Sequence, residues 1–263
     1  MIKFSIIVVS LNTKNKLENT IKSITKQSLK SYEIIVVDGK SNDGTIKLIS
    51  KYKKNLKKIL IKKDRGIYFA MNRGIKLASN EWLIFLNSGD TFYSINTLKK
   101  IGLNIKKNKN IDILVGNTKI INQNIVYKKK FKKLSSKSLT SCFSHQSCTI
   151  KRSIHKKNYF KTKYKIAADF NFFKEVFKKN AKFFYINETI SVNEAYGLSD
   201  KKRFLALREF RNINRFNKNI NFKFIKYFML SLYFVINFFS KLLIPLFLQK
   251  QILRLKIFFN KSI

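Results

Sequence analysis

The sequence has few of the residues that interrupt or cross-link a chain. It contains one Pro and eight Gly among 263 residues, so it has no Pro- or Gly-rich linker between flexible modules. Its two cysteines, Cys142 and Cys148, are too few for a disulfide scaffold and are typical of a reducing compartment. Together with His145, and with His155 as a further candidate ligand, they could ligate Zn²⁺, but the short spacing favours two small thiols in a core loop. Because Met1-Ile2-Lys3 leads directly into a strand-like run, we expect no secretory signal peptide.

Acidic residues are also scarce. The 14 Asp and Glu stand against 55 Lys and Arg, which gives a formal net charge of +41. Such a charge suits nucleic acid, an anionic membrane surface or a nucleotide ligand. Because the lysines are spread along the chain instead of gathering in one arm, we expect no nucleic-acid partner. A basic nucleic-acid-binding protein stays as an alternative, and it would retain RNA or DNA with a steep salt dependence.

The C-terminal part has a different character. The run Tyr227–Ser240 carries no charge, and the segment 228–248 has about the length that a membrane span needs. Because Lys241 and Pro245 lie inside this segment, a surface or re-entrant helix pair with basic flanks is an alternative to a span. A hydrophobic helix packed on the domain is another. We expect residues 200–263 to form a helical, basic and hydrophobic region that associates with a membrane.

The N-terminal part alternates between strand-like and helix-like patterns. Continuous β-branched runs predict strands buried on both faces, and apolar residues at helical spacing predict amphipathic helices between them. The expected strands are Phe4–Leu11, Glu33–Val37, Ile59–Ile61 and Trp82–Leu86, and the expected helices are Lys14–Gln27, Ile46–Lys53 and Ile67–Ala78. This order predicts an α/β fold with a mainly parallel sheet flanked by helices. In the less regular second half we expect helices at Thr97–Lys107, Asp169–Phe177 and Lys201–Asn214, strands at Ile111–Val115 and Lys182–Ile186, and a hairpin over residues 118–131.

Two of the expected strands end in a carboxylate. Asp38 ends the second strand, and Asp90 follows the fourth in the polar turn Asn87-Ser88-Gly89-Asp90. Ligands of open α/β sheets bind at the carboxyl edge, where these strands end. At that edge Asp38 can accept a hydrogen bond from the N–H of a base. Asp90 can hold a hard divalent cation that neutralises a diphosphate, with the amide oxygen of Asn87 beside it, or it is an ordinary turn residue.

Two further segments place polar residues before an expected helix. Asp64-Arg65-Gly66 precedes a helix whose first N–H groups can meet an anion. Arg65 there either pairs with a phosphate or lies in a surface turn. Asp169 follows Ala167-Ala168 and opens a helix, where it is a candidate proton acceptor, an N-cap residue, or both.

Six short strings occur in an order that resembles a known family. They are FSIIVVSLN at the start, VVDGKSNDGT (36–45), DRGIYFAMNRGI (64–75), FLNSGD (85–90), SHQS (144–147) and YKIAADFNFF (164–173). Over residues 4–199 the chain resembles a family-2 glycosyltransferase with the GT-A nucleotide-sugar fold. Within that family it is most similar to the subgroup that builds bacterial surface and extracellular polysaccharides. The resemblance implies a GT-A domain over residues 1–199, with residues 200–263 as the C-terminal region, at the cytoplasmic face of the bacterial inner membrane.

The resemblance also implies an activity and a role for each candidate residue. The activity is inverting transfer of a sugar from a UDP-linked donor to a glycan or lipid-linked acceptor. Asp169 would be the general base, and Asp90 would hold Mg²⁺ or Mn²⁺. Contacts with the nucleotide or donor are implied for Asp38, Arg65, Asn72 and Asn87, and the base at Asp38 would be uracil. Contacts with the substrate on the acceptor side are implied for His145 and Gln146.

The sequence departs from the family pattern at two positions. Phe69 stands where the family often has Asp. Asp90 is the single acid at a position where most members have two or three. These sparse acids motivate an alternative, a catalytically degenerate GT-A fold that serves as a membrane-bound assembly partner.

Overall fold

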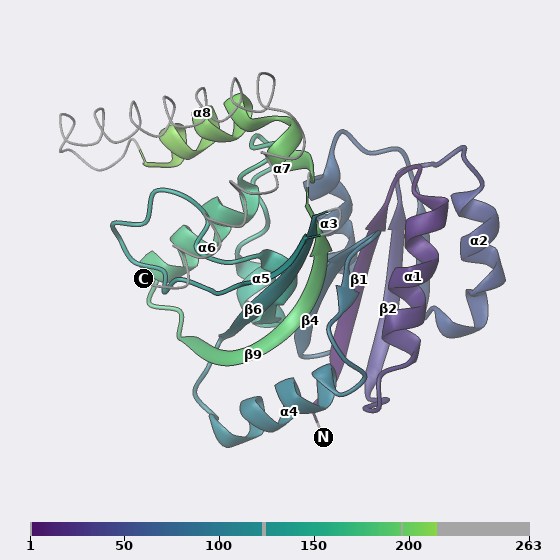
Figure 1. The fold of residues 1–263 in the computed structure, drawn as a ribbon, viewed down its shortest axis with the longest axis horizontal. Coiled ribbons are helices and arrows are strands. Elements are labelled where there is room, and N and C mark those ends of the chain that lie inside the picture. The colour runs from purple at the N-terminus through teal and green to yellow at the C-terminus, as the bar shows by residue number, and fades with distance from the viewer. Residues whose placement is uncertain (1, 123–124, 196, 215–263) are drawn as a thin grey trace. The chain divides into compact units, whose positions relative to one another are not determined.

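The computed structural model describes residues 2–122, 125–195 and 197–214. Within these residues the chain forms one nine-stranded sheet with helices on its faces (Figure 1). The strand order is β3-β2-β1-β4-β8-β6-β9-β5, and β7 pairs with β6. The fold is therefore α/β, as the alternating patterns predict.

The first half of the sheet is parallel and confirms the predicted strands and helices. Its strands are β1 (Phe4–Ser10), β2 (Tyr32–Asp38), β3 (Lys58–Ile61) and β4 (Trp82–Asn87). Between them lie α1 (Lys14–Thr25), α2 (Thr45–Lys51), the short 3₁₀ helix η1 (Lys53–Asn55) and α3 (Ile67–Leu77). β1 pairs in parallel with both β2 and β4, and β2 pairs in parallel with β3. A strand with neighbours on both sides and helices above and below is apolar throughout, which explains the continuous run at the start of the sequence.

Alternate residues of β1 bury opposite faces of the sheet. Ile6 and Val8 belong to the apolar cluster that also contains Leu17 and Ile21 of α1. Ile7 faces the other way, against Gly74 of α3, where an added Cβ would lie 2.3 Å from Ile7 Cγ2. Helix α4 (Thr97–Lys107) joins the α1 side through its own buried apolar face. Each fully buried Ile or Leu in this cluster contributes roughly 1.5–3 kcal/mol of transfer free energy to the folded state.

The second half of the sheet is mixed, and here the prediction of a mainly parallel sheet is wrong. Strand β8 (Cys148–Lys151) lies antiparallel between β4 and β6 (Ile113–Asn122), and β5 (Thr91–Phe92) lies antiparallel to β9 (Phe183–Glu194). β6 and β9 pair in parallel. The predicted hairpin is confirmed, since β7 (Ile125–Lys129) pairs antiparallel with β6. Short strands such as β8 carry too little local pattern to be found by periodicity.

The remaining helices lie between or after the strands of this second half in the chain. They are the 3₁₀ helix η2 (His145–Ser147), α5 (Arg152–Lys157), α6 (Ala168–Lys178), α7 (Leu198–Lys201) and α8 (Arg203–Asn214). The helices predicted at Asp169–Phe177 and Lys201–Asn214 are thus confirmed as α6 and α8. Two compact units divide the chain after Ala206, and the whole sheet lies in the first. The domain boundary expected after residue 199 stays a prediction.

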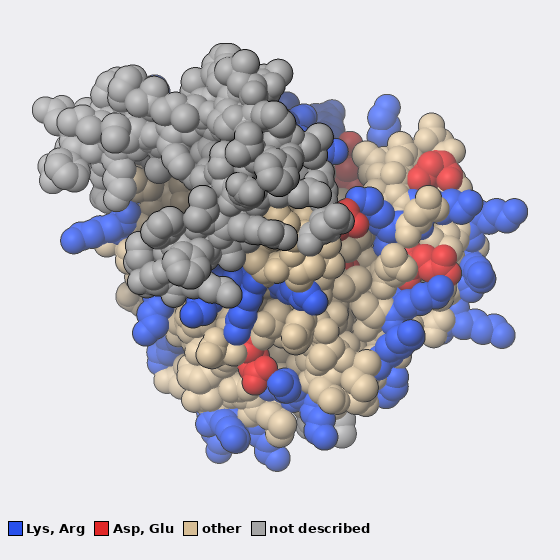
Figure 2. Space-filling view, in the orientation of Figure 1, with Lys and Arg blue, Asp and Glu red and all other residues tan. Residues whose placement is uncertain are grey.

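The expected membrane-associating segment is not supported by the described structure. Among the residues that are described, no helix is long and apolar enough to cross a membrane. The segment 228–248, on which the prediction depends, lies outside them. Figure 2 shows Lys and Arg side chains scattered around the visible described surface, with few acids between them, so the positive charge on this face is distributed.

Candidate active site

The register of the parallel strands brings the two predicted strand-end segments together. Ser10 pairs with Asp38 across β1 and β2, and Val9 pairs with Asn87 across β1 and β4. Asp38 and the turn that follows Asn87 therefore lie at the same carboxyl edge of the sheet, where open α/β sheets bind ligands. Strand β1 lies between β2 and β4 and aligns Asp38 with Asn87, which is 49 residues further along the chain, so β1 sets the geometry of the site.

Asp38 is fully buried and orders the loop that follows it. Its Oδ2 accepts hydrogen bonds from Ser10 Oγ and Ser41 Oγ, both at 2.7 Å, and its Oδ1 accepts one from Ser41 N–H at 2.7 Å. A carboxylate offers about four lone-pair sites, so one acceptor position remains beyond these three bonds. Asp38 thus stabilises the loop that follows it through these hydrogen bonds, and its contact with a base stays a prediction.

The turn from Asn87 to Asp90 is closed by hydrogen bonds within itself. Asp90 Oδ2 accepts from Asn87 N–H at 3.1 Å, and Asp90 N–H donates to the Asn87 carbonyl at 2.9 Å. Gly89 takes a φ of +104°, a left-handed conformation that favours glycine. From η2, Gln146 donates its Nε2–H to Asp90 Oδ2 at 2.9 Å. Burial raises the pKa of Asp90 to about 6, although the Gln146 hydrogen bond acts in the opposite direction.

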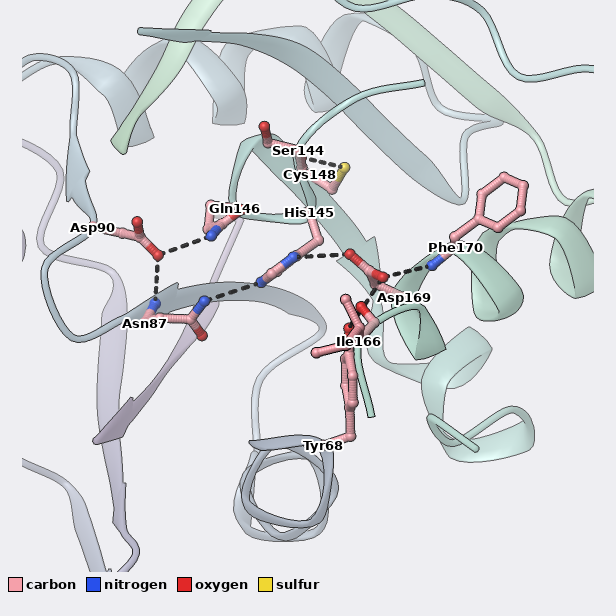
Figure 3. Close-up of polar contacts among 10 residues, drawn as sticks. All are labelled: Tyr68, Asn87, Asp90, Ser144, His145, Gln146, Cys148, Ile166, Asp169 and Phe170. Carbon is pink, nitrogen blue, oxygen red and sulfur yellow. Dashed lines mark hydrogen bonds and ion pairs between the residues drawn. The ribbon is translucent and has the colours of Figure 1, made fainter. Parts of the chain in front are cut away.

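His145 connects this turn to Asp169, the third predicted carboxylate. Its Nε2 lies 3.4 Å from Asn87 Nδ2, and its Nδ1 lies 3.2 Å from Asp169 Oδ2 (Figure 3). An amide nitrogen can only donate, so Nε2 accepts and the ring proton of neutral His145 sits on Nδ1. The ring is therefore oriented to donate to Asp169. His145, predicted as a substrate contact, has both nitrogens directed at protein groups.

Asp169 lies in the first turn of α6 and is held from several sides. Its Oδ2 faces His145, while its Oδ1 accepts from Phe170 N–H at 2.8 Å and from Tyr68 Oη–H at 3.1 Å. The side chain is 16% exposed, so one part of it still reaches solvent. Burial raises the pKa of Asp169, but the hydrogen bonds from His145, Phe170 and Tyr68 outweigh burial and hold the pKa below its ordinary value. Asp169 is therefore an ionised carboxylate at neutral pH, as a proton acceptor must be.

Arg65 and Asn72 are placed differently from these residues. Arg65 is exposed and has no ion pair or hydrogen bond within the described part of the chain. Asn72, on α3, donates from Nδ2 to the Phe160 carbonyl at 2.8 Å and accepts from Phe160 N–H at 3.0 Å. Its amide therefore fastens the segment before α6 to α3. The donor contacts proposed for both residues stay predictions.

The site offers oxygen ligands for a cation but no complete cage. Asn87 Oδ1 is buried without a hydrogen-bond partner, and no hydrogen bond from a described residue reaches Asp90 Oδ1. Magnesium sites commonly use one or two carboxylates and take their remaining ligands from water and substrate phosphates. Asp90 and Asn87 fit that arrangement. No group of three His, Cys, Asp or Glu that could hold a metal occurs among the described residues, so Zn²⁺ at Cys142, His145 and Cys148 gains nothing from the structure.

Tyr68 contacts the site residue Asp169 and was not predicted from the sequence. It lies on α3, 6% exposed, and its hydroxyl donates to the Ile166 carbonyl at 2.7 Å as well as to Asp169. Tyr68, Met71 and Ile75 share one buried helix face, which periodicity could have found. Its partner lies 101 residues away, which no local pattern could have found.

The fold and the site place the chain among the α/β proteins that have carboxylates at the carboxyl edge of the sheet. Ligands of open α/β sheets, nucleotides among them, bind at that edge. The family model described as Glycosyl transferase family 2 matches residues 5–184, and the chain belongs to this family. This membership confirms the resemblance that the six strings indicated. The mixed α/β sheet described above agrees with the expected GT-A-like fold.

Several characterised proteins resemble parts of the chain. The PGL/p-HBAD biosynthesis glycosyltransferase of Mycobacterium bovis (strain BCG / Pasteur 1173P2) is 36% identical over 116 residues, which cover 43% of this chain and 45% of that protein. The poly(ribitol-phosphate) beta-N-acetylglucosaminyltransferase TarP of Staphylococcus aureus is 35% identical over 121 residues, covering 44% and 36%. The matched segments thus span less than half the length of these relatives.

Solved structures share the fold at low sequence identity. S. aureus TarS 1–349 in complex with UDP-GlcNAc gives a TM-score of 0.67 at 22% identity and covers 81% of this chain and 64% of that one. The mannosyltransferase PcManGT of Pyrobaculum calidifontis, in complex with GDP-Man and Mn²⁺, gives 0.58 at 15% identity, covering 73% and 56%. At these identities the likeness concerns the fold alone.

Proposed function

We propose that this protein is an inverting glycosyltransferase that moves a sugar from a UDP-linked donor to a glycan or lipid-linked acceptor in bacterial surface polysaccharide synthesis. Membership of the family and the partly exposed, ionised Asp169 support this proposal. The similarity to TarP, a poly(ribitol-phosphate) beta-N-acetylglucosaminyltransferase, supports a polymeric acceptor. The carrying observation is that Asp38 and the Asn87–Asp90 turn lie at one carboxyl edge of the sheet, and that His145 links this turn to the ionised Asp169.

The proposed reaction uses Asp169 as general base. The acceptor hydroxyl gives its proton to Asp169, and its oxygen bonds to the anomeric carbon of the donor sugar. The bond between that carbon and the diphosphate oxygen breaks, and the leaving nucleoside diphosphate keeps the electron pair. His145 holds the carboxylate in place during this step through its Nδ1–H. Gln146 and Asn87 N–H hold Asp90 toward the donor side of the site.

A bound Mg²⁺ or Mn²⁺ would neutralise the negative charge on the departing diphosphate. Asp90 and the unpartnered Oδ1 of Asn87 would hold it. Asn87 would then serve two groups, since its Nδ2 contacts His145. Asp38 would meet the base, and Arg65 would pair with a phosphate.

A donor screen tests the proposal. Full-length protein with Mn²⁺ is incubated with common UDP- and GDP-sugars, and the release of free nucleoside diphosphate is measured. We expect release with at least one UDP-sugar and a loss of about 10²–10⁴-fold in the Asp169→Asn variant, the range that general bases contribute. Full activity of that variant would overturn the base assignment. No release with any donor would favour the degenerate assembly partner, which the single acid at Asp90 motivates.

We also propose that the protein acts at the cytoplasmic face of the inner membrane, held there by residues 200–263, either peripherally or through 228–248. The uncharged run and its basic flanks support this location. Flotation of the full chain with vesicles that contain anionic lipid tests it. Protein that remains unbound at low salt would contradict the proposal, and retained RNA or DNA would favour the nucleic-acid alternative.

A further inference from the structure

Tyr68 is placed to control the orientation of Asp169. Its hydroxyl proton is shared between the Ile166 carbonyl at 2.7 Å and Asp169 Oδ1 at 3.1 Å (Figure 3). Ile166 lies three residues before Asp169, so a single hydroxyl contacts both the backbone leading into α6 and the carboxylate at its start. The phenol ring packs on Phe160 with centroids 5.4 Å apart. This buried ring gives the hydroxyl a fixed position.

The two oxygens of Asp169 are used unequally. Oδ1 accepts from Tyr68 Oη–H and Phe170 N–H, whereas Oδ2 accepts from His145 Nδ1–H. A carboxylate oxygen has two lone-pair sites. Among the described residues the donors therefore fill Oδ1 and leave one site on Oδ2. This remaining lone-pair site on Oδ2 is where the carboxylate can accept a proton from an acceptor hydroxyl.

We propose that Tyr68 is a positioning residue for Asp169: anchored on the Ile166 carbonyl, its hydroxyl holds Oδ1 and so presents Oδ2 to the acceptor hydroxyl. The inference rests on the proposed function, because it needs Asp169 to be the base. The proton moves from the acceptor hydroxyl to Oδ2, the acceptor oxygen bonds to the anomeric carbon, and the diphosphate leaves with the electron pair. Oδ1 keeps both of its donors throughout, so the carboxylate need not rotate.

The hydroxyl also stabilises the charged form of the carboxylate. Burial raises the pKa of Asp169, and Tyr68 is one of the donors, with His145 and Phe170, that together lower it. Titratable side chains that face Asp169 are His145 from η2, Tyr68 from α3 and Cys148 from β8. The Cys148 thiol is neutral, because burial raises its pKa well above the usual value. Removing the Tyr68 hydroxyl is therefore expected to raise the pH at which Asp169 ionises.

The Tyr68→Phe variant tests this inference. We expect kcat to fall by about tenfold, while the donor KM stays within about twofold, because the lost bond acts on the base alone. The acidic limb of the kcat/KM profile should move up by about 0.5–1 pH unit, the effect of one hydrogen bond to a carboxylate. Tyr159→Phe is the matched control, since Tyr159 is 37% exposed and contacts Lys76 instead. That variant should match the wild type in all three quantities.

A second variant decides the question if Tyr68→Phe does not fold. Incorporation of 3-fluorotyrosine at position 68 keeps the ring and the hydroxyl, while the more acidic phenol donates more strongly. The acidic limb should then move down, opposite to the Phe variant. An unmoved limb in both variants, or a higher donor KM with unchanged kcat, would overturn the inference. If Tyr68→Phe is unaffected while Asp169→Asn is inactive, the inference fails and the proposed function stands; an active Asp169→Asn removes both.

Discussion

Replacing His155 with Phe should make the folded protein less sensitive to acid. His155 lies on α5 and is fully buried, and its ring stacks on Phe172 of α6 at 4.1 Å and 9°. Phe85 and Phe160 surround it, and neither ring nitrogen has a hydrogen-bond partner within the described residues. In this apolar setting the charged imidazolium is strongly disfavoured, so burial lowers the pKa of His155 from 6.5 to about 3.

The size of the effect follows from proton linkage. The folded-state pKa lies below the unfolded-state value, so His155 contributes stability that is fully present above pH 6.5 and is lost as the pH falls. At pH 5 the unfolded chain binds this proton and the folded chain does not, which costs the folded state about 2 kcal/mol. Below pH 3 the loss approaches about 5 kcal/mol. In the Phe variant this loss is absent, while the stacked ring is kept.

Urea unfolding between pH 7.5 and pH 5, followed by fluorescence, measures this difference. The single tryptophan, Trp82, is 1% exposed in β4 and reports on the sheet. We expect the free energy of unfolding of the wild type to fall relative to the variant by about 2 kcal/mol over this range. Asp90, whose raised pKa has the opposite effect on stability, is common to both proteins and cancels. Equal pH dependence in the two proteins would refute the reasoning, because His155 would then not be held neutral by burial.

Two other predictions concern the cation and the packing. Asp90→Ala should lower the affinity for UDP in Mn²⁺ by at least about tenfold and leave the affinity without metal unchanged, as seen by calorimetric titration, because it removes the one carboxylate of the turn. An equal loss in both conditions would mean that Asp90 holds no cation. Gly74→Ala should destabilise the protein by about 1–3 kcal/mol, because the new Cβ would lie 2.3 Å from Ile7 Cγ2. Gly102→Ala is its control: nothing lies nearer than 3.9 Å there, so the helix should gain up to about 1 kcal/mol in urea unfolding.

The elements of the first half were predictable because their signals are local. β1 and β4 are apolar runs buried on both faces, and such runs can be recognised without knowing their neighbours. The parallel order followed from the alternation of strands and helices. The antiparallel insertion of β8 was not predictable, since a four-residue strand has no periodicity of its own.

The candidate site divides in the same way. Asp38 and Asp90 were recognised because Asp38 ends one strand and Asp90 lies in the turn after another, and strand ends can be located from the sequence. The partners of these carboxylates were not predictable. Asn72, expected at the donor, hydrogen-bonds the backbone of Phe160, 88 residues away, and His145 meets Asp169 across 24 residues. Such pairs depend on how η2 and α6 pack against the parallel half.

Local sequence patterns set where the strands end and therefore which carboxylates lie at the carboxyl edge of the sheet, because the apolar runs and the polar turns that end them are neighbours in the chain. The tertiary structure alone decided how those carboxylates are held. Hydrogen bonds from His145 of η2, Phe170 N–H and Tyr68 of α3 together hold the Asp169 carboxylate and keep its pKa below the ordinary value. A hydrogen bond between distant residues forms when packing brings its donor within about 3 Å, and no local pattern encodes that approach.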